Sequence, residues 1–291
     1  MLLNMVSPTT VGLAVGLIAL IIASWCDIKT REVPDWLNYS LIAFALASAV
    51  TLSIYHNYSH IFFESLLGAG FGVLIGLAMF YTGQWGGGDA KLIIGIAALI
   101  GFSVSDISKS SMYFLVFLVN ILLVGSLYGL GYSFVKAIIN YKLFKPAIEE
   151  KLRSKTALII RIILLVLGIG AFIFLVASRS IESAVLFGLA LAFFLFFYLW
   201  AFVSTVEQVC MIKKTPVSKL TEGDWISGNV MKGKKIILQP QKTGLTLEDI
   251  ALLKKKKIKE VLVKIGVPFV PSFLIAYILT FAVGNWMAYL M

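Results

Sequence analysis

The chain has 291 residues, of which 59% are hydrophobic and 14% are charged, and its mean hydropathy is +0.94. A soluble globular protein does not carry this much apolar surface, so the composition excludes a soluble enzyme and predicts a protein that crosses the membrane several times. The formal net charge of +10 does not require a nucleic-acid partner, because the basic residues concentrate in loops between apolar segments, where they face anionic lipid headgroups.

Apolar stretches of bilayer length recur along the chain. We expect eight spans, at residues 9–26, 36–54, 62–82, 90–104, 111–134, 158–177, 183–206 and 267–290. The fourth is short for a bilayer, so whether it crosses is judged from the distribution of basic residues between the loops on the two sides of the membrane. With eight spans and an external N-terminus, the two most basic loops face the cytoplasm; they hold six basic residues from Lys136 to Lys155 and thirteen from Lys213 to Lys264. Without the fourth span both loops would lie outside, which the positive-inside rule disfavours.

One sizeable polar segment, residues 207–265, follows the seventh predicted span. Within it, DWISGNV and KKIILQP alternate as short strands do, and TLEDIALLKKKK predicts a helix with Thr246 as its N-cap. The sequence therefore predicts an all-α polytopic membrane protein with a small cytoplasmic α/β insert. Its expected parts are a membrane domain at 1–206, the insert at 207–265, and a final helix at 266–291 that packs on the membrane domain.

Carboxylates at the ends of membrane spans are the first candidates for a functional site. Asp27 ends the first predicted span and Asp89 begins the fourth, so both are expected on the cytoplasmic side at similar depth. Two carboxylates held close together in a poorly solvated place share one proton and can act as base and acid on a water molecule. Glu64 and Glu207 also lie at span ends, where a helix N-terminus and the membrane interface explain them more simply.

Three glycines precede Asp89 in the stretch GQWGGGDAKL, residues 83–92. Glycine permits sharp bends and positive φ and leaves space for another chain, so Gly86 and Gly88 predict a loop that places the carboxylate beside a substrate backbone. A plain glycine-rich turn with Asp89 as helix N-cap is an equally good interpretation of the composition. Lys91 either lowers the pKa of Asp89 or extends its amine to lipid headgroups.

Three segments resemble the type IV prepilin peptidase and preflagellin peptidase family of membrane aspartyl proteases: WCDIKTREVPDWLN at 25–38, GGGDAKL at 86–92 and VPFVPSFLIA at 267–276. The Gly-x-Gly-Asp motif of the family corresponds to Gly86–Asp89. Its first catalytic aspartate, which precedes a basic stretch and Pro-Asp, corresponds to Asp27.

The resemblance implies a leader peptidase of the archaeal type, with Asp27 and Asp89 catalytic and with no metal or other cofactor. Its partners would be the lipid bilayer and precursors of pilin-like or flagellin-like subunits, cut at the cytoplasmic face of the cell membrane. The oligomeric state stays open. The chain has no CxxC pair, so the methylation activity of bifunctional bacterial members is not predicted.

Several neighbouring residues have simpler structural interpretations. Asp35 follows Pro34 and is expected to be the N-cap of the second span. Pro268 and Pro271 either begin the last span, as prolines often do, or border the substrate path, as a proline-containing stretch does in related membrane aspartyl proteases.

The glycines of the third span have a regular spacing. Gly68, Gly72 and Gly76 recur every four residues and predict a face on which a second helix packs closely.

An ion-coupled transporter is the alternative function, because carriers also combine intramembrane acids with glycine-broken and proline-containing helices. Carriers favour acids at the membrane midplane and repeated halves, whereas Asp27 and Asp89 are expected at one face and the sequence shows no internal repeat. A presenilin-like protease would share the Gly-Asp motif, but its Tyr-Asp pair and Pro-Ala-Leu motif are absent from the chain.

The predicted orientation can be checked by labelling single cysteines from outside intact cells, in a background with Cys26 and Cys210 replaced by serine. We expect a membrane-impermeant reagent to label His56→Cys and Ser178→Cys and to leave Lys255→Cys unlabelled. External labelling at position 255 would overturn the span count and the shared side of the two aspartates.

Overall fold

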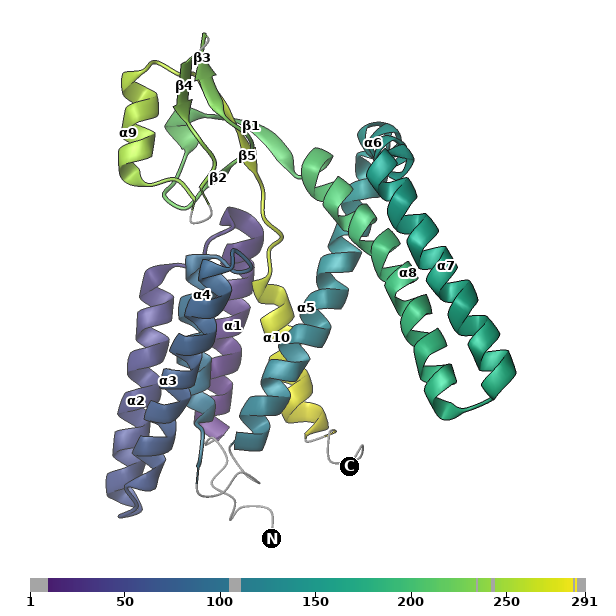
Figure 1. Cartoon of the computed structure of the whole chain (residues 1–291). Coiled ribbons are helices and arrows are strands. Elements are labelled where there is room, and N and C mark those ends of the chain that lie inside the picture. The colour runs from purple at the N-terminus through teal and green to yellow at the C-terminus, as the bar shows by residue number, and fades with distance from the viewer. Residues whose placement is uncertain (1–9, 105–110, 234, 242–243, 285, 287–291) are drawn as a thin grey trace. The chain divides into compact units, whose positions relative to one another are not determined.

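The computed structural model describes residues 10–104, 111–233, 235–241, 244–284 and 286. The chain forms two compact units, one from residues 1–129 and 214–291 and the other from residues 130–213 (Figure 1). The first unit contains both aspartates that the sequence singles out.

Outside the insert, the described residues of the first unit form six helical segments. They are α1 (Thr10–Thr30), α2 (Asp35–Tyr55), α3 (His60–Tyr81), α4 (Gly87–Ile100), the first part of α5 (Met112–Ile139), and α10 (Val270–Val283). Helices α2, α3 and α4 pack side by side, and α10 packs against α1. Side chains of α1, α4, α5 and α10 share one hydrophobic core, with Leu20, Ile93, Phe117 and Phe273 among its fully buried members. The last helix therefore completes a core that the first helix begins.

Polar contacts inside this core fix α10 to its neighbours. Asn120 of α5 donates to the Thr280 hydroxyl at 2.9 Å and accepts from the Trp286 ring N–H at 3.1 Å. Tyr277 donates to the Leu13 carbonyl of α1 at 3.2 Å. Buried polar groups are costly without partners, so each pairing ties α10 to one position along α1 and α5.

The glycine face of α3 lies against α4, as predicted. A Cβ atom at Gly72 would lie 2.8 Å from the Ile94 Cα atom, and one at Gly76 would lie 2.6 Å from the Ala90 carbonyl oxygen. A Cβ atom at Gly68 would clash with the backbone carbonyl of Ala97 in α4. These neighbours are backbone atoms that cannot rotate away, so only glycine allows the two helices to approach this closely.

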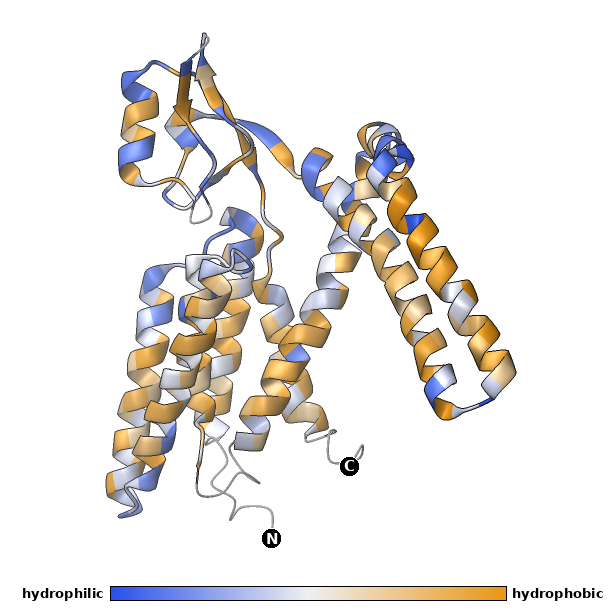
Figure 2. Cartoon of the chain, in the orientation of Figure 1, coloured by the Kyte–Doolittle hydropathy of each residue, from blue (hydrophilic) through white to orange (hydrophobic). Residues whose placement is uncertain are grey.

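The hydropathy of the helices confirms a polytopic membrane protein (Figure 2). Each of the eight predicted spans contains a helix, and six of these helices are long and apolar enough to cross a membrane. Helices α4 and α10 have only 14 residues each, where a perpendicular span needs about 20. Short length was expected for the fourth segment; the predicted last span, residues 267–290, runs beyond the described residues.

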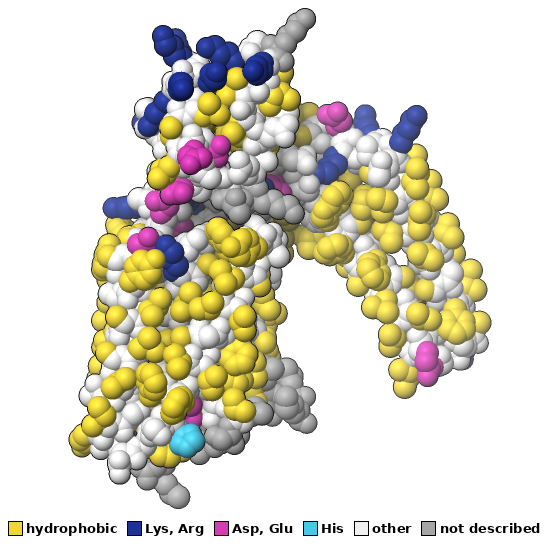
Figure 3. Space-filling model, turned by 60° about the vertical axis from the view of Figure 1, so that its left-hand side comes forward, with side chains coloured by type: hydrophobic (Ala, Val, Ile, Leu, Met, Phe, Trp, Pro, Cys, Tyr) yellow, Lys and Arg dark blue, Asp and Glu magenta, His cyan; other side chains and the backbone are white. Residues whose placement is uncertain are grey.

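The second unit consists of the end of α5 and three further helices, α6 (Tyr141–Arg153), α7 (Lys155–Ser178) and α8 (Ile181–Val209). Helices α7 and α8 pack together as an antiparallel pair whose other faces carry exposed apolar side chains, as a lipid-facing surface does (Figure 3). Helix α6 was not predicted from the sequence. It is amphipathic, and the Arg161 guanidinium of α7 donates to the Leu152 carbonyl near its end at 2.7 Å.

The predicted α/β insert is present; it begins after the end of α8 at Val209, and its residues from 214 onward belong to the first unit. Its elements are β1 (Ile212–Pro216), a short 3-10 helix η2 (Val217–Lys219), β2 (Trp225–Ile226), β3 (Val230–Lys232), β4 (Lys235–Leu238), α9 (Leu247–Lys255) and β5 (Glu260–Lys264). Strands β1, β5 and β2 form one sheet in that order, and β3 and β4 form a separate hairpin. Strands β2 and β5 are antiparallel, with Trp225 opposite Lys264.

The insert has its own hydrophobic core. Ile226, Leu253 and Val261 are among the buried residues that close it. The Thr246 hydroxyl accepts the Asp249 N–H at 3.2 Å, which confirms the predicted N-cap of α9. Lys and Arg side chains gather at one end of the insert (Figure 3).

The glycine face generates a stability prediction with an internal control. We expect Gly76→Ala to lower the free energy of unfolding by about 1–3 kcal/mol, because the added methyl group has to push α4 away from α3. Gly70→Ala, on the same helix, has no atom within 4 Å of the new methyl group and should be neutral or slightly stabilising. Thermal unfolding in detergent measures both; equal effects would contradict the packing argument.

Candidate functional site

Asp27 lies in the last turn of α1 and is 5% exposed. Its Oδ2 atom accepts the N–H of Val270 at 2.9 Å, and Val270 is the first residue of α10. The first N–H groups of a helix have no partner within that helix, and the positive end of the helix dipole favours a carboxylate there. Asp27 therefore serves as the cap of a helix that begins 243 residues later in the chain.

Asp89 is the third residue of α4 and is partly exposed. Gly86, not Asp89, occupies the N-cap position of α4, so the interpretation of Asp89 as N-cap is wrong. The Asp89 carboxylate instead reaches back and accepts the Gly86 N–H at 3.2 Å. Each of the two aspartates is thus held by an N–H at the start of a helix, Asp27 by α10 and Asp89 by α4.

Trp85 connects the segment that carries Asp89 to the start of α10. Its side chain is 4% exposed, and its ring centroid lies 5.0 Å from that of Phe273 and 6.2 Å from that of Phe269. Phe269 directly precedes Val270, the residue that binds Asp27. The two carboxyl groups are close enough to interact electrostatically. The structure therefore brings both predicted aspartates together around the N-terminus of α10.

Gly88 is the glycine of the motif at which close approach matters. A Cβ atom at Gly88 would lie 3.1 Å from both the backbone nitrogen and the Cβ atom of Val33. Cβ atoms at Gly86 and Gly87 would have ordinary contacts at 3.7 and 3.8 Å. Positive φ does not explain these three glycines: φ is −72° at Gly86, and only Gly83 in this stretch, at +73°, is left-handed. The motif therefore needs space at one position, because the chain before α2 passes directly over it.

Helix α2 contacts the start of α4 at two further points. Asp35 is the first residue of α2 and not its N-cap, which is Pro34, so the predicted capping role is wrong. Its carboxylate forms an ion pair of 2.7 Å with Lys91, so Lys91 pairs with α2. Asn38, which is fully buried, donates from Nδ2 to the Gly88 carbonyl at 3.3 Å.

The prolines of the last segment lie where the sequence places them. Pro271 is the second residue of α10, which agrees with its interpretation as a helix-starting proline. Pro268 is buried and precedes the N-cap, Phe269. Both flank the residue that binds Asp27, while a role in the substrate path stays a prediction. Glu207 lies in the last turn of α8, in the second unit.

Sequence reasoning did not find Asn38, Trp85 or the Val270 N–H. A signal existed for the first two: Asn38 is a polar residue inside an apolar span, and Trp85 is the one aromatic residue of the glycine-rich stretch. The Val270 N–H has no sequence signal, because a backbone group is the same at every position.

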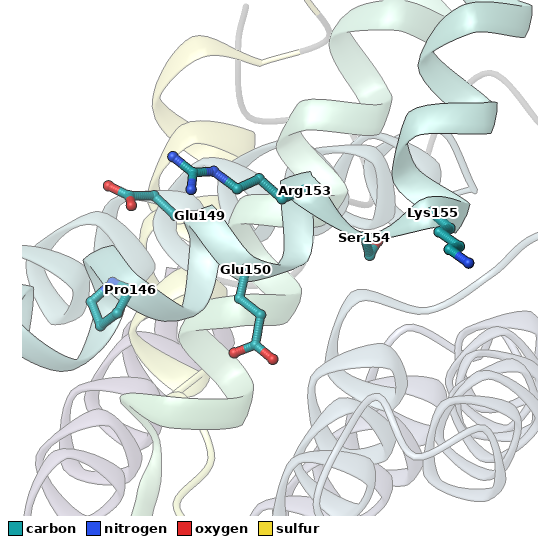
Figure 4. Close-up of a pocket in the computed structure, with 6 residues that line it drawn as sticks. All are labelled: Pro146, Glu149, Glu150, Arg153, Ser154 and Lys155. Carbon is teal, nitrogen blue, oxygen red and sulfur yellow. The ribbon is translucent and has the colours of Figure 1, made fainter.

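A hollow on the second unit is separate from this constellation. It is lined by Pro146, Glu149, Glu150, Arg153, Ser154 and Lys155 at the junction of α6 and α7. Glu149 and Arg153 point to one side of α6 and Glu150 to the other (Figure 4). Its lining mixes both signs of charge and contains neither aspartate, so the candidate site remains the pair at α10.

Comparison with known proteins gives matches within the first unit and the start of the second. Residues 14–133 match the model of the Type IV leader peptidase family. A preflagellin peptidase of Methanocaldococcus jannaschii is 40% identical over 91 residues, which are 31% of this chain and 38% of that protein. Preflagellin peptidases of Methanococcus maripaludis and Methanococcus voltae are 37% and 35% identical over 90 and 92 residues, or 30% and 31% of this chain. These alignments span 37% and 38% of the two relatives. No solved structure gives a significant match.

Proposed function

Because residues 14–133 match the Type IV leader peptidase family, we propose that the chain belongs to that family and is a membrane-embedded aspartyl endopeptidase. Its substrates are precursors of pilin-like or flagellin-like subunits, from which it removes a short basic leader. Asp27 and Asp89 are its catalytic residues. The matched stretch includes both aspartates. The alignments with the preflagellin peptidases cover less than two fifths of the length of those proteins.

The observation that carries this proposal is the convergence of the two carboxyl groups at the start of α10. Asp27 binds the first N–H of α10, and Asp89 follows a tryptophan that packs on the same end of that helix. Two carboxyl groups held near one another share one proton in an aspartic protease, so that one is ionised and the other protonated.

The proposed reaction follows from this shared proton. The ionised carboxylate takes a proton from a water molecule, and the water oxygen bonds to the carbonyl carbon of the scissile peptide. The protonated carboxyl group gives its proton to the carbonyl oxygen, which forms a tetrahedral diol. When the diol collapses, the C–N bond breaks and the leaving amine takes up the proton first removed from water. One hydroxyl of the diol meanwhile returns its proton to the second carboxylate and becomes the carbonyl oxygen of the new carboxyl terminus. Both carboxyl groups return to their starting states.

The location of the aspartates suits a substrate that is itself anchored in the membrane. Asp27 lies in the last turn of an apolar helix and Asp89 in the first turn of another. A precursor with a basic leader and an apolar helix keeps the leader at the cytoplasmic face, so its scissile bond lies where the apolar segment begins. We therefore place the site at the cytoplasmic face of the cell membrane, with the N-terminus outside.

The transporter alternative gains no support from the comparisons. Each of the matched relatives is a preflagellin peptidase, and the matching family is one of leader peptidases. Carrier sites lie near the bilayer midplane between repeated halves, whereas we place both aspartates at one membrane face, and the sequence shows no internal repeat.

The direct test replaces each aspartate by asparagine, which has the same shape but cannot accept the proton of the attacking water. We expect Asp27→Asn and Asp89→Asn each to abolish cleavage of a pilin or flagellin precursor while the protein still inserts and unfolds normally. Cleavage is read by the size of the product and by its N-terminal sequence.

Asp35→Asn is the matched control, since Asp35 lies outside the pair and its ion pair with Lys91 is exposed. Such a pair contributes about 0–1 kcal/mol, so this variant should retain activity. Full turnover by Asp27→Asn or by Asp89→Asn would rule out the aspartyl mechanism.

A second prediction concerns the three glycines before Asp89. Gly88→Ala should lose most activity, because its methyl group would lie 3.1 Å from Val33 and would shift the residue next to Asp89, where the rate depends steeply on geometry. Gly87→Ala and Gly86→Ala have room for the methyl group and should lose little. Initial rates at matched enzyme levels measure the difference; equal mild effects at all three positions would show that the contact with Val33 is unimportant.

A further inference from the structure

We propose that Asn38 is a positioning residue: its side-chain amide holds the Gly88–Asp89 peptide so that the Asp89 carboxyl group stays beside Asp27. The inference rests on the proposed function for its catalytic consequence. It adds a residue of α2 to a site otherwise formed by α1, α4 and α10.

The geometry places Asn38 one peptide unit away from the proposed catalytic side chain. Its Nδ2 atom donates to the Gly88 carbonyl oxygen at 3.3 Å, across 50 residues of sequence. The Gly88 carbonyl and the Asp89 N–H belong to the same planar peptide group. Fixing that carbonyl therefore fixes the orientation of the plane from which the Asp89 side chain extends.

Packing alone does not explain an asparagine at this position. Asn38 is 0% exposed, and its Oδ1 atom is buried without a hydrogen-bond partner among the described residues. A buried acceptor left unpaired is destabilising, so leucine, which has a similar size, would give a fold at least as stable. What asparagine supplies and leucine lacks is the N–H donor to Gly88.

The surroundings of Gly88 make this donor effective. Val33 lies so close to Gly88 that a Cβ atom there would be 3.1 Å from the Val33 backbone nitrogen. The first turns of α2 and the residues before them thus enclose Gly88 from two directions, Val33 by contact and Asn38 by hydrogen bond. The Asp35–Lys91 ion pair links the same two helices at the surface, where side chains are 61% and 36% exposed. Exposed pairs define a position weakly, whereas a buried hydrogen bond defines it well.

The kinetic test uses Asn38→Leu, with Asp35→Asn as control. We expect kcat on a precursor to fall by about 10- to 100-fold, with KM changed by less than about twofold and the melting temperature unchanged or raised. The control should keep kcat within about twofold of the unaltered protein. Wild-type kcat in Asn38→Leu, or a loss of activity that follows a lower melting temperature, would overturn the inference.

A second measurement does not depend on catalysis. Hydrogen exchange of the detergent-solubilised protein should become faster in peptides covering residues 83–92 of Asn38→Leu and stay unchanged in peptides of α3. Unchanged exchange across residues 83–92 would overturn the positioning role. If the unaltered protein cleaves no precursor, the proposed function fails, and the exchange result still decides whether Asn38 holds the Gly88–Asp89 peptide.

Discussion

The structure around the candidate site depends on one hydrogen bond, from the Val270 N–H at the start of α10 to the Asp27 carboxylate at the end of α1. Both groups are buried, so each would be costly if left alone in an apolar environment. The pairing satisfies the first N–H of a short helix and at the same time orients one of the two aspartates. A residue proposed for catalysis is thereby also a structural cap.

The position of α10 carries this constraint to the second aspartate. Phe269 and Phe273 pack on Trp85, four residues before Asp89, while Asn120 and Tyr277 tie α10 to α5 and α1. Helix α10 lies outside the stretch that matches the leader peptidase family, residues 14–133. The part of the chain that holds both aspartates therefore depends on a helix far outside that stretch for its geometry.

Helix α4 is placed by contacts that leave little tolerance. The glycine face of α3 meets its backbone on one side, and Val33 and Asn38 meet Gly88 on the other. Such contacts stabilise a single arrangement because close-packed backbones and buried hydrogen bonds do not slide. With Asp89 in its first turn, α4 can be short and still hold a side chain accurately.

The sequence alone determined the class of protein, the position of a helix in each of the eight apolar segments, the insert with its Thr246 cap and the glycine face of α3. Hydropathy, residue spacing and helix capping are local properties, so they can be recognised along the sequence without knowledge of the fold. The sequence also predicted the two candidate aspartates. It did not determine which N–H binds Asp27, that Trp85 packs on α10, that Gly86 and not Asp89 begins α4, or that Asp35 pairs with Lys91 and Asn38 with Gly88. Those pairings join residues up to 243 positions apart. Only the tertiary structure decided them, since a backbone N–H or a buried amide has no preferred partner until packing brings one within hydrogen-bond distance.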